Sequence, residues 1–167
     1  MKLDTKGIAI LAFIVGLLTF FVFMPSKGLQ GIPTALQVQT LEGENLSLDS
    51  LRGKPYLLTF WSTTCPGCVA EIPLLQALNQ KMQNTGFRTI AVAMSYDVRT
   101  EVEAMRTQKG MTYTVAHDQN GELAKQFEVR VTPTSFLVGA DGNIAVRKMG
   151  EWKEAELEQK VRELLKG

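Results

Sequence analysis

The chain contains two cysteines, Cys65 and Cys68, separated by Pro66-Gly67. On a helix this spacing puts the two side chains about 5–6 Å apart, so a small adjustment brings the sulfur atoms to bonding distance. The thiolate is the nucleophile of thiol–disulfide exchange, and a second nearby thiol resolves the mixed disulfide that forms. We therefore expect Cys65 to attack a partner disulfide and Cys68 to release the product.

Other uses of a C-x-x-C pair fit the chain less well. A c-type haem site needs histidine directly after the second cysteine, and that position is Val69. A structural zinc site needs four ligands, and the chain adds a single histidine, His117, which we expect in a loop or at the surface. A purely structural disulfide across so short a loop would stabilise little. We favour a redox-active pair that needs no metal and no diffusible cofactor.

The pair lies where a strand is followed by a helix. Tyr56–Phe60 is apolar and strand-like, and beyond Cys68 the apolar residues recur at helical spacing, at Val69, Ile72, Leu75 and Leu78. The unpaired N–H groups and the dipole of a helix N-terminus favour a thiolate at Cys65. Pro66 suits the first helical turn, and Gly67 leaves one side open to a partner's backbone.

The N-terminal segment carries no charge from Gly7 to Met24, over 18 residues. This length is typical of a transmembrane helix, whereas a cleaved signal peptide, the alternative, has a shorter apolar core and a small-x-small cleavage site. Lys2 and Lys6 favour a cytoplasmic N-terminus. We expect a single-pass anchor in the bacterial cytoplasmic (inner) membrane, with both cysteines on the periplasmic or extracytoplasmic side, where disulfides persist.

The whole chain has room for one domain, and its composition is ordinary for a globular protein. Its 167 residues are 45% hydrophobic and 21% charged, and the net charge of +1 gives no sign of a nucleic-acid partner. We divide it into an anchor over 1–24, a linker rich in Gly, Pro and Ser over 25–33, and a domain over 34–167.

The pattern of the domain predicts alternating strands and helices after a short N-terminal β-hairpin over 35–48. Strands are expected over 56–60, 87–94, 112–116, 135–138 and 144–148. Helices are expected over 65–84, 98–109, 122–127 and 151–166. The order β-α-β-α and then β-β-α indicates an α/β fold, with a mixed central sheet flanked by helices on both faces.

Several of these residues together resemble the thioredoxin superfamily, and more narrowly its membrane-anchored TlpA/ResA-type branch. The resemblance rests on Phe60-Trp61, the C-P-G-C motif, Glu71-Ile72-Pro73, Val131–Val138 and Asp141–Ile144. It implies a thioredoxin-like fold and a cis peptide bond before Pro133, which lies against the disulfide; from the residues alone a trans bond would be expected. It also implies a partner-binding surface formed by Trp61, Pro66, Gly67, Thr132 and Pro133.

Glu71 is a third catalytic candidate, because in this branch a glutamate at the matching position is thought to tune the cysteines and relay protons. A partly buried carboxyl group has a raised pKa and exchanges protons with a thiol near neutral pH. The chain departs from the branch at Thr64, where many relatives have tryptophan. Pro-Gly between the cysteines also reverses the Gly-Pro of thioredoxin.

The resemblance implies a protein thiol–disulfide oxidoreductase that acts on exported proteins, for instance apocytochrome c, and is recharged by a membrane thiol–disulfide electron donor. Two alternatives remain. A peroxiredoxin-like thiol peroxidase is consistent with Ser62, three residues before Cys65, but it needs proline where the chain has Leu58. A non-enzymatic Cu(I)-binding module would use the same two cysteines, although the chain lacks Met-x-Met and His-rich tracts.

Overall fold

The computed structural model of the chain describes residues 14–16 and 36–166. The anchor predicted over 7–24 and the linker over 25–33 lie outside the described residues, apart from the helical residues 14–16. Among the residues that are described, none of the helices is both long and apolar enough to cross a membrane.

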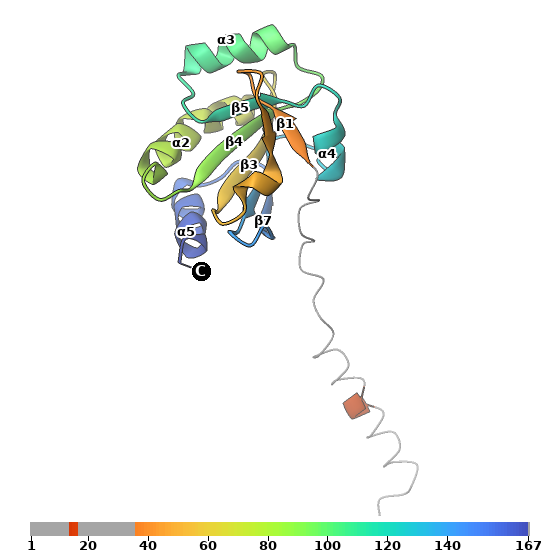
Figure 1. The fold of residues 1–167 in the computed structure, drawn as a ribbon, viewed down its shortest axis with the longest axis vertical. Helices are drawn as coiled ribbons and strands as arrows, with labels where there is room; N and C mark the ends of the chain where they lie inside the picture. Colours follow the sequence, from red (N-terminus) through yellow and green to blue (C-terminus); the bar gives the residue numbers. More distant parts are fainter. Residues whose placement is uncertain (1–13, 17–35, 167) are drawn as a thin grey trace, which may run out of the picture.

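A five-stranded mixed sheet forms the centre of the domain (Figure 1). Its strand order is β5-β4-β3-β6-β7. The parallel half consists of β3 (Tyr56–Trp61), β4 (Arg88–Ala93) and β5 (Thr114–His117), and β6 (Thr134–Val138) and β7 (Ile144–Met149) complete the sheet as antiparallel neighbours. This is the mixed α/β architecture predicted from the order of the elements.

The central strand β3 is buried along its whole length. Because successive side chains of a strand point to opposite faces, Leu57 and Trp61 join one apolar cluster, whereas Leu58 and Phe60 join the other. A strand covered on both faces is apolar throughout rather than alternating, which explains why the segment before the cysteines is so hydrophobic.

Three helices cover one face of the sheet, namely α2 (Pro66–Met82), α3 (Arg99–Lys109) and α5 (Glu154–Leu164). Their buried apolar residues, such as Leu78, Val102 and Leu157, belong to the same cluster as Leu57 and Trp61. Helices α2 and α5 lie side by side (Figure 1), and Lys81 of α2 pairs there with Glu154 at 3.3 Å and also with Glu158. The helix carrying the cysteines is therefore held against both the sheet and the terminal helix.

The opposite face is covered by the short helix α4 (Glu122–Gln126), the 3-10 turn η1 (Leu48–Leu51) and an N-terminal strand pair. In that pair β1 (Gln37–Gln39) runs antiparallel to β2 (Asn45–Ser47). Three aromatic rings, Phe60, Phe127 and Phe136, meet on this face with centroids 4.9–6.0 Å apart. The prediction of helices on both faces is confirmed.

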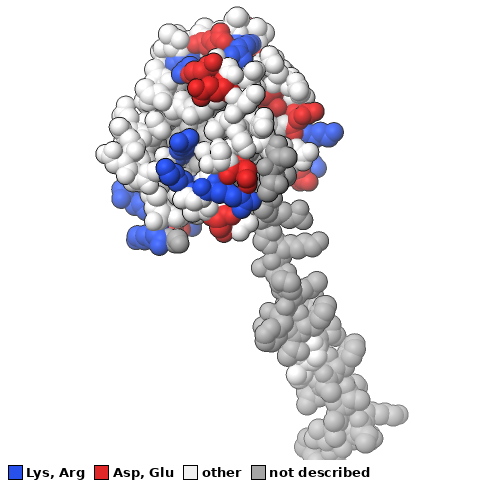
Figure 2. All heavy atoms as spheres, in the orientation of Figure 1, with Lys and Arg blue, Asp and Glu red and all other residues white. Residues whose placement is uncertain are grey.

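The terminal helix begins later than expected. The prediction is 151–166, but α5 starts at Glu154. Gly150 has a positive φ of 84°, residues 151–153 lie outside regular secondary structure, and Lys153 is extended. The segment bonds to Pro133 and Glu71, two residues near the redox pair, as described below. Surface charges of both signs are interspersed on the face drawn in Figure 2, which agrees with the small net charge.

Candidate active site

Cys65 occupies the N-cap of α2, as the sequence predicts. Its backbone is extended, with φ −93° and ψ 109°, and its Sγ accepts a hydrogen bond from the backbone N–H of Cys68 at 3.2 Å. Pro66 fills the first helical turn, where a missing N–H costs nothing. This N–H group and the helix dipole stabilise negative charge on the Cys65 sulfur.

The two cysteines form a disulfide whose Cα atoms are 5.3 Å apart. Cys65 is partly exposed, whereas only 3% of Cys68 is accessible. A partner protein can therefore reach the Cys65 sulfur. The Cys68 sulfur lies deeper, in the apolar cluster that α2, α3 and α5 form with the sheet. This asymmetry matches the expected division into an attacking and a resolving cysteine.

The loop before β6 brings the Thr132 carbonyl to Cys65. Thr132 is partly exposed, whereas Pro133, which was expected at the partner-binding surface, is buried. The Thr132–Pro133 peptide bond is cis, as the resemblance implied. The Thr132 carbonyl oxygen lies 3.5 Å from the Cys65 sulfur, although 67 residues separate them in the sequence. They meet because β6 is the direct neighbour of β3 in the sheet, so the end of one strand adjoins the start of the other.

Glu71 lies one helical turn after Cys68 and is 4% exposed. Its Oε1 accepts a hydrogen bond of 2.6 Å from the backbone N–H of Trp152. Burial raises the pKa of the Glu71 carboxyl to about 7; the Trp152 N–H opposes this rise, the Glu151 charge adds to it, and the Lys148 charge opposes it. The group can therefore take up or release a proton near neutral pH beside a thiol.

The loop before Cys65 is fastened by Asp97, which is 6% exposed. The Asp97 carboxylate accepts hydrogen bonds from the Ser62 hydroxyl at 2.8 Å, the Thr63 N–H at 3.0 Å and the Thr63 hydroxyl at 3.1 Å. The Ser62 Oγ in turn accepts the N–H of Thr64 at 3.2 Å. These contacts hold the backbone that leads into Cys65 against the loop following β4.

Three residues expected at the partner surface lie in different surroundings. Pro66 is exposed beside Cys65, as expected. Trp61 is only 4% exposed and packs in the core, so its side chain offers almost no surface to a partner in this state. Gly67 was expected to leave an open side, but the Glu151 carboxylate lies there: a Cβ on Gly67 would be 2.5 Å from Glu151 Oε1.

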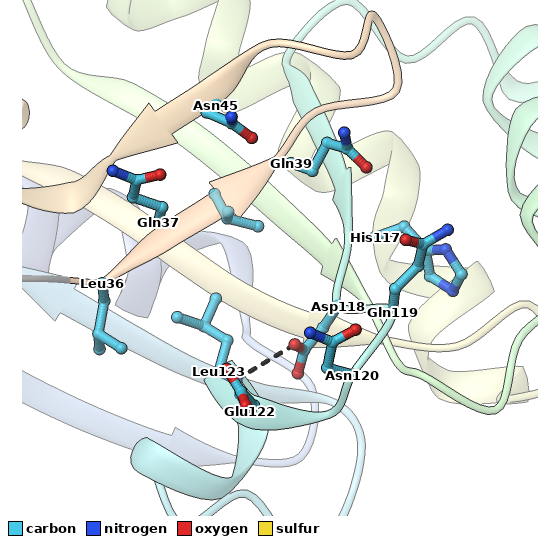
Figure 3. A pocket seen from close by; sticks show the side chains of 11 residues that line it. Leu36, Gln37, Gln39, Asn45, His117, Asp118, Gln119, Asn120, Glu122 and Leu123 are labelled. Carbon is cyan, nitrogen blue, oxygen red and sulfur yellow. Dashed lines mark hydrogen bonds between the residues drawn. The ribbon is translucent and has the colours of Figure 1, made fainter.

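His117 lies inside the protein rather than in a surface loop. It ends β5, is 6% exposed, and both of its ring nitrogens are buried without a hydrogen-bond partner in the described structure. It borders a pocket of about 400 Å³ whose other lining residues include Gln37, Gln39 and Gln119 (Figure 3). The residues of the redox site are not among those that line this pocket.

Sequence reasoning missed Asp97 as a residue of the site and missed Glu151 and Tyr113 entirely. The Asp97 role was detectable in principle, because it follows the strand next to β3 and the carboxyl ends of parallel strands share one edge of a sheet.

Tyr113 is buried, and desolvation together with the Glu71 charge raises the pKa of its phenol. Within residues 14–16 and 36–166, no group of three or more metal-binding side chains gathers at one place.

A profile of the AhpC/TSA family matches residues 31–147. The thiol-disulfide oxidoreductase ResA of Bacillus thuringiensis subsp. konkukian is 32% identical over 127 residues, covering 76% of this chain and 73% of that protein. The sporulation thiol-disulfide oxidoreductase A of Bacillus subtilis is 25% identical over 161 residues, covering 94% of this chain and 97% of that protein.

A solved structure supports the same assignment. The solution structure of a candidate thioredoxin from Neisseria meningitidis superimposes with a TM-score of 0.77 at 30% identity, covering 83% of this chain and 92% of that one. The five-stranded mixed sheet and its helices are thus a thioredoxin-like fold. Together with the profile match and the geometry around Cys65, these similarities show that the chain belongs to the AhpC/TSA family, as a thioredoxin-like thiol–disulfide oxidoreductase of the ResA type with Cys65–Cys68 as its redox pair.

Proposed function

We propose that the protein is a reductant of exported proteins, tethered to the outer face of the bacterial cytoplasmic membrane by residues 7–24. The uncharged N-terminal run and the lysines before it support the tether and its orientation. In this arrangement residues 25–33 are a linker and the domain begins near residue 34. Partners are exported proteins that carry a disulfide, such as oxidised apocytochrome c, and a membrane thiol–disulfide donor restores the reduced pair.

The reaction follows from the geometry of the pair. The Cys65 thiolate attacks one sulfur of the partner disulfide, a mixed disulfide forms, and the partner's other sulfur leaves as a thiolate that takes up a proton. Cys68 then loses its proton and attacks the Cys65 sulfur, which expels the partner's remaining thiolate. Two electrons pass to the partner, and the protein ends with the Cys65–Cys68 disulfide that the structure shows.

The observation that carries the reducing direction is the buried Glu71 carboxyl near Cys68. A carboxyl group with a pKa of about 7 accepts the proton that Cys68 must lose before it attacks. Once ionised, it also disfavours thiolate on the neighbouring cysteine. A less stable reduced state means a lower reduction potential. Strongly oxidising thiol–disulfide proteins have the opposite property, because their reduced form is stabilised and their potential is high.

The reduction potential of the full-length chain tests the direction. We expect a value below about −230 mV, at or beyond the reducing end of the glutaredoxin range. It is measured by equilibrating the protein with thiol–disulfide buffers and counting free thiols by mass after alkylation. A potential near about −120 mV, typical of a strong oxidant, would contradict the proposal.

Trapping in intact cells tests the partners and the location. A Cys68→Ser variant leaves the mixed disulfide unresolved, so exported proteins with disulfides should accumulate as covalent adducts, whereas Cys65→Ser, the matched control, should trap none.

A thiol reagent that does not cross membranes should label the full-length chain in unbroken cells. If the chain is labelled only after the cells are broken, the domain lies on the cytoplasmic side of the membrane, and the proposed location is wrong.

The alternative is a peroxiredoxin-like enzyme that reduces peroxide. The geometry of the site favours thiol–disulfide exchange instead. The Ser62 hydroxyl donates to Asp97 and also contacts the Thr64 hydroxyl at 3.0 Å, so it is engaged away from the Cys65 sulfur. The resolving Cys68 is already bonded to Cys65. Turnover of hydrogen peroxide exceeding that of a disulfide peptide would reverse this preference.

A further inference from the structure

The segment Gly150–Trp152 is fastened on both sides of Glu151. The N–H of Gly150 donates to the carbonyl oxygen of Pro133 at 2.8 Å, and the N–H of Trp152 donates to Glu71 Oε1 at 2.6 Å. Pro133 lies in the loop facing Cys65, and Glu71 lies on the helix that carries both cysteines. The backbone of Glu151 is therefore positioned by the two structures that surround the disulfide.

The Glu151 side chain extends from this segment to the turn between the cysteines. Its Oε1 occupies space 2.5 Å from where a Cβ of Gly67 would lie, so only glycine at that position leaves room for the carboxylate as it stands. Glu151 is exposed. Burial is the main cause of the raised pKa of Glu71, and the Glu151 charge adds to that rise. A negative charge thus lies at the surface that a partner must approach.

No cation in the described part of the chain forms an ion pair with this charge. Within residues 14–16 and 36–166, the Glu151 carboxylate takes part in no ion pair and no hydrogen bond. The nearby Lys148 is engaged with Glu156 at 2.8 Å, and its Nζ lies 5.1 Å from the ring centroid of Trp152. An exposed carboxylate that is unpaired among the described residues lies at the turn between the cysteines, where it is available to a partner's cation.

We propose that Glu151 is a specificity-determining residue that selects partners with lysine or arginine next to the reacting cysteine. The inference rests on the proposed function, because it concerns which disulfides the pair reduces. Opposite charges attract during encounter and in the mixed disulfide, whereas an acidic residue on the partner is repelled. An exposed ion pair with Glu151 should change the rate of partner reduction about two- to fivefold. Attraction of lysine and repulsion of glutamate together should therefore make the ratio of the two rates about tenfold.

The test uses the reduced full-length chain and three synthetic peptides. Each peptide contains one disulfide, and the three are identical except for two positions beside the first cysteine, which are lysine, serine or glutamate. Second-order rate constants for peptide reduction are measured by stopped-flow at about 20 mM and about 500 mM salt. The variants are Glu151→Gln, Glu151→Lys and, as control, Glu154→Gln, which removes the same charge from a neighbouring exposed residue paired with Lys81.

The wild-type chain should reduce the lysine peptide about tenfold faster than the glutamate peptide at low salt, and high salt should remove most of this ratio. Glu151→Gln should lower the ratio to about threefold or less, and Glu151→Lys should invert it. Glu154→Gln should keep the wild-type ratio. An unchanged ratio in Glu151→Gln, or an equal fall in Glu154→Gln, overturns the role of Glu151.

The serine peptide separates this inference from the proposed function. If the wild-type chain reduces the serine peptide but does not distinguish the charged ones, the function stands and the specificity is wrong. If the serine peptide is not reduced and Cys65→Ser behaves like the wild type, the reducing function is wrong, and the specificity is overturned with it.

Discussion

The Glu71 carboxyl and the backbone N–H of Trp152 are joined by a hydrogen bond of 2.6 Å across 81 residues of sequence. One partner belongs to the helix of the redox pair, and the other precedes the terminal helix. Glu71 is a buried, titratable group one helical turn after the resolving cysteine on α2. The bond also joins α2 to the segment that leads into α5, and it opposes the rise that burial causes in the pKa of the Glu71 carboxyl.

The first prediction concerns proton transfer. Glu71→Gln keeps an oxygen that accepts the Trp152 N–H but removes the group that takes the Cys68 proton. Release of the partner from the mixed disulfide should slow by about tenfold or more, because positioned acid–base groups contribute at least that much. The change is measured by rapid acid quenching and mass analysis of the mixed disulfide during reduction of a peptide.

The pH profile provides the control for this prediction. In the wild type the release step should accelerate through an inflection near pH 7, which is the pKa of the Glu71 carboxyl. In Glu71→Gln the inflection should disappear, while the first attack by Cys65 should remain at least as fast. A variant that keeps the inflection would show that another group accepts the proton.

The second prediction concerns the free energy of unfolding of the oxidised form. The Glu71 pKa is about 7 in the folded state against an ordinary value of 4.5, so the folded state holds this proton more tightly than the unfolded chain. The stability that depends on the protonated group is complete below pH 4.5 and is lost as pH rises through about 7. The loss is on the order of 3 kcal/mol.

Urea titrations of the wild type and Glu71→Gln at about pH 5 and about pH 8.5 measure this loss. The two proteins should be similarly stable at the lower pH, because glutamine resembles the protonated carboxyl. At the higher pH the variant should be the more stable. Equal stability at both values would mean that burial does not hold the proton on Glu71.

The third prediction concerns the loop before Cys65. Asp97→Asn removes the charge that receives the Ser62 hydroxyl and the two donors of Thr63, and should lower the free energy of unfolding by about 1–3 kcal/mol. The looser loop should also shift the pH at which Cys65 is half alkylated and slow peptide reduction severalfold. Alkylation rates across pH measure the positioning effect separately from stability.

Asp118→Asn is the matched control for the loop prediction. Asp118 is a second buried aspartate, and its oxygens accept the N–H groups of Leu123 at 3.1 Å and Ala124 at 2.8 Å at the start of α4. This variant should lose a comparable stability yet leave Cys65 alkylation unchanged. If both variants shift alkylation equally, Asp97 acts only through overall stability.

Local features of the chain were enough to predict the elements and the redox pair. Apolar runs of strand length, helical periodicity and glycine turns depend on neighbours in sequence, so the order of strands and helices and the mixed sheet followed from them. The placement of Cys65 at a helix N-terminus followed in the same way. The cis bond before Pro133 did not, and it was reached only through the resemblance of the motifs.

What the sequence alone determined was therefore the local chemistry: a C-x-x-C pair between a buried strand and a helix. What only the tertiary structure decided was which distant residues surround it. Asp97 follows β4, Glu151 follows β7 and Thr132 precedes β6. All three lie near the pair because these strand ends adjoin the end of β3, which leads into Cys65. Such contacts depend on strand order and on where α5 begins. No short-range pattern encodes them, because they join residues that are far apart in the sequence, such as Cys65 and Thr132.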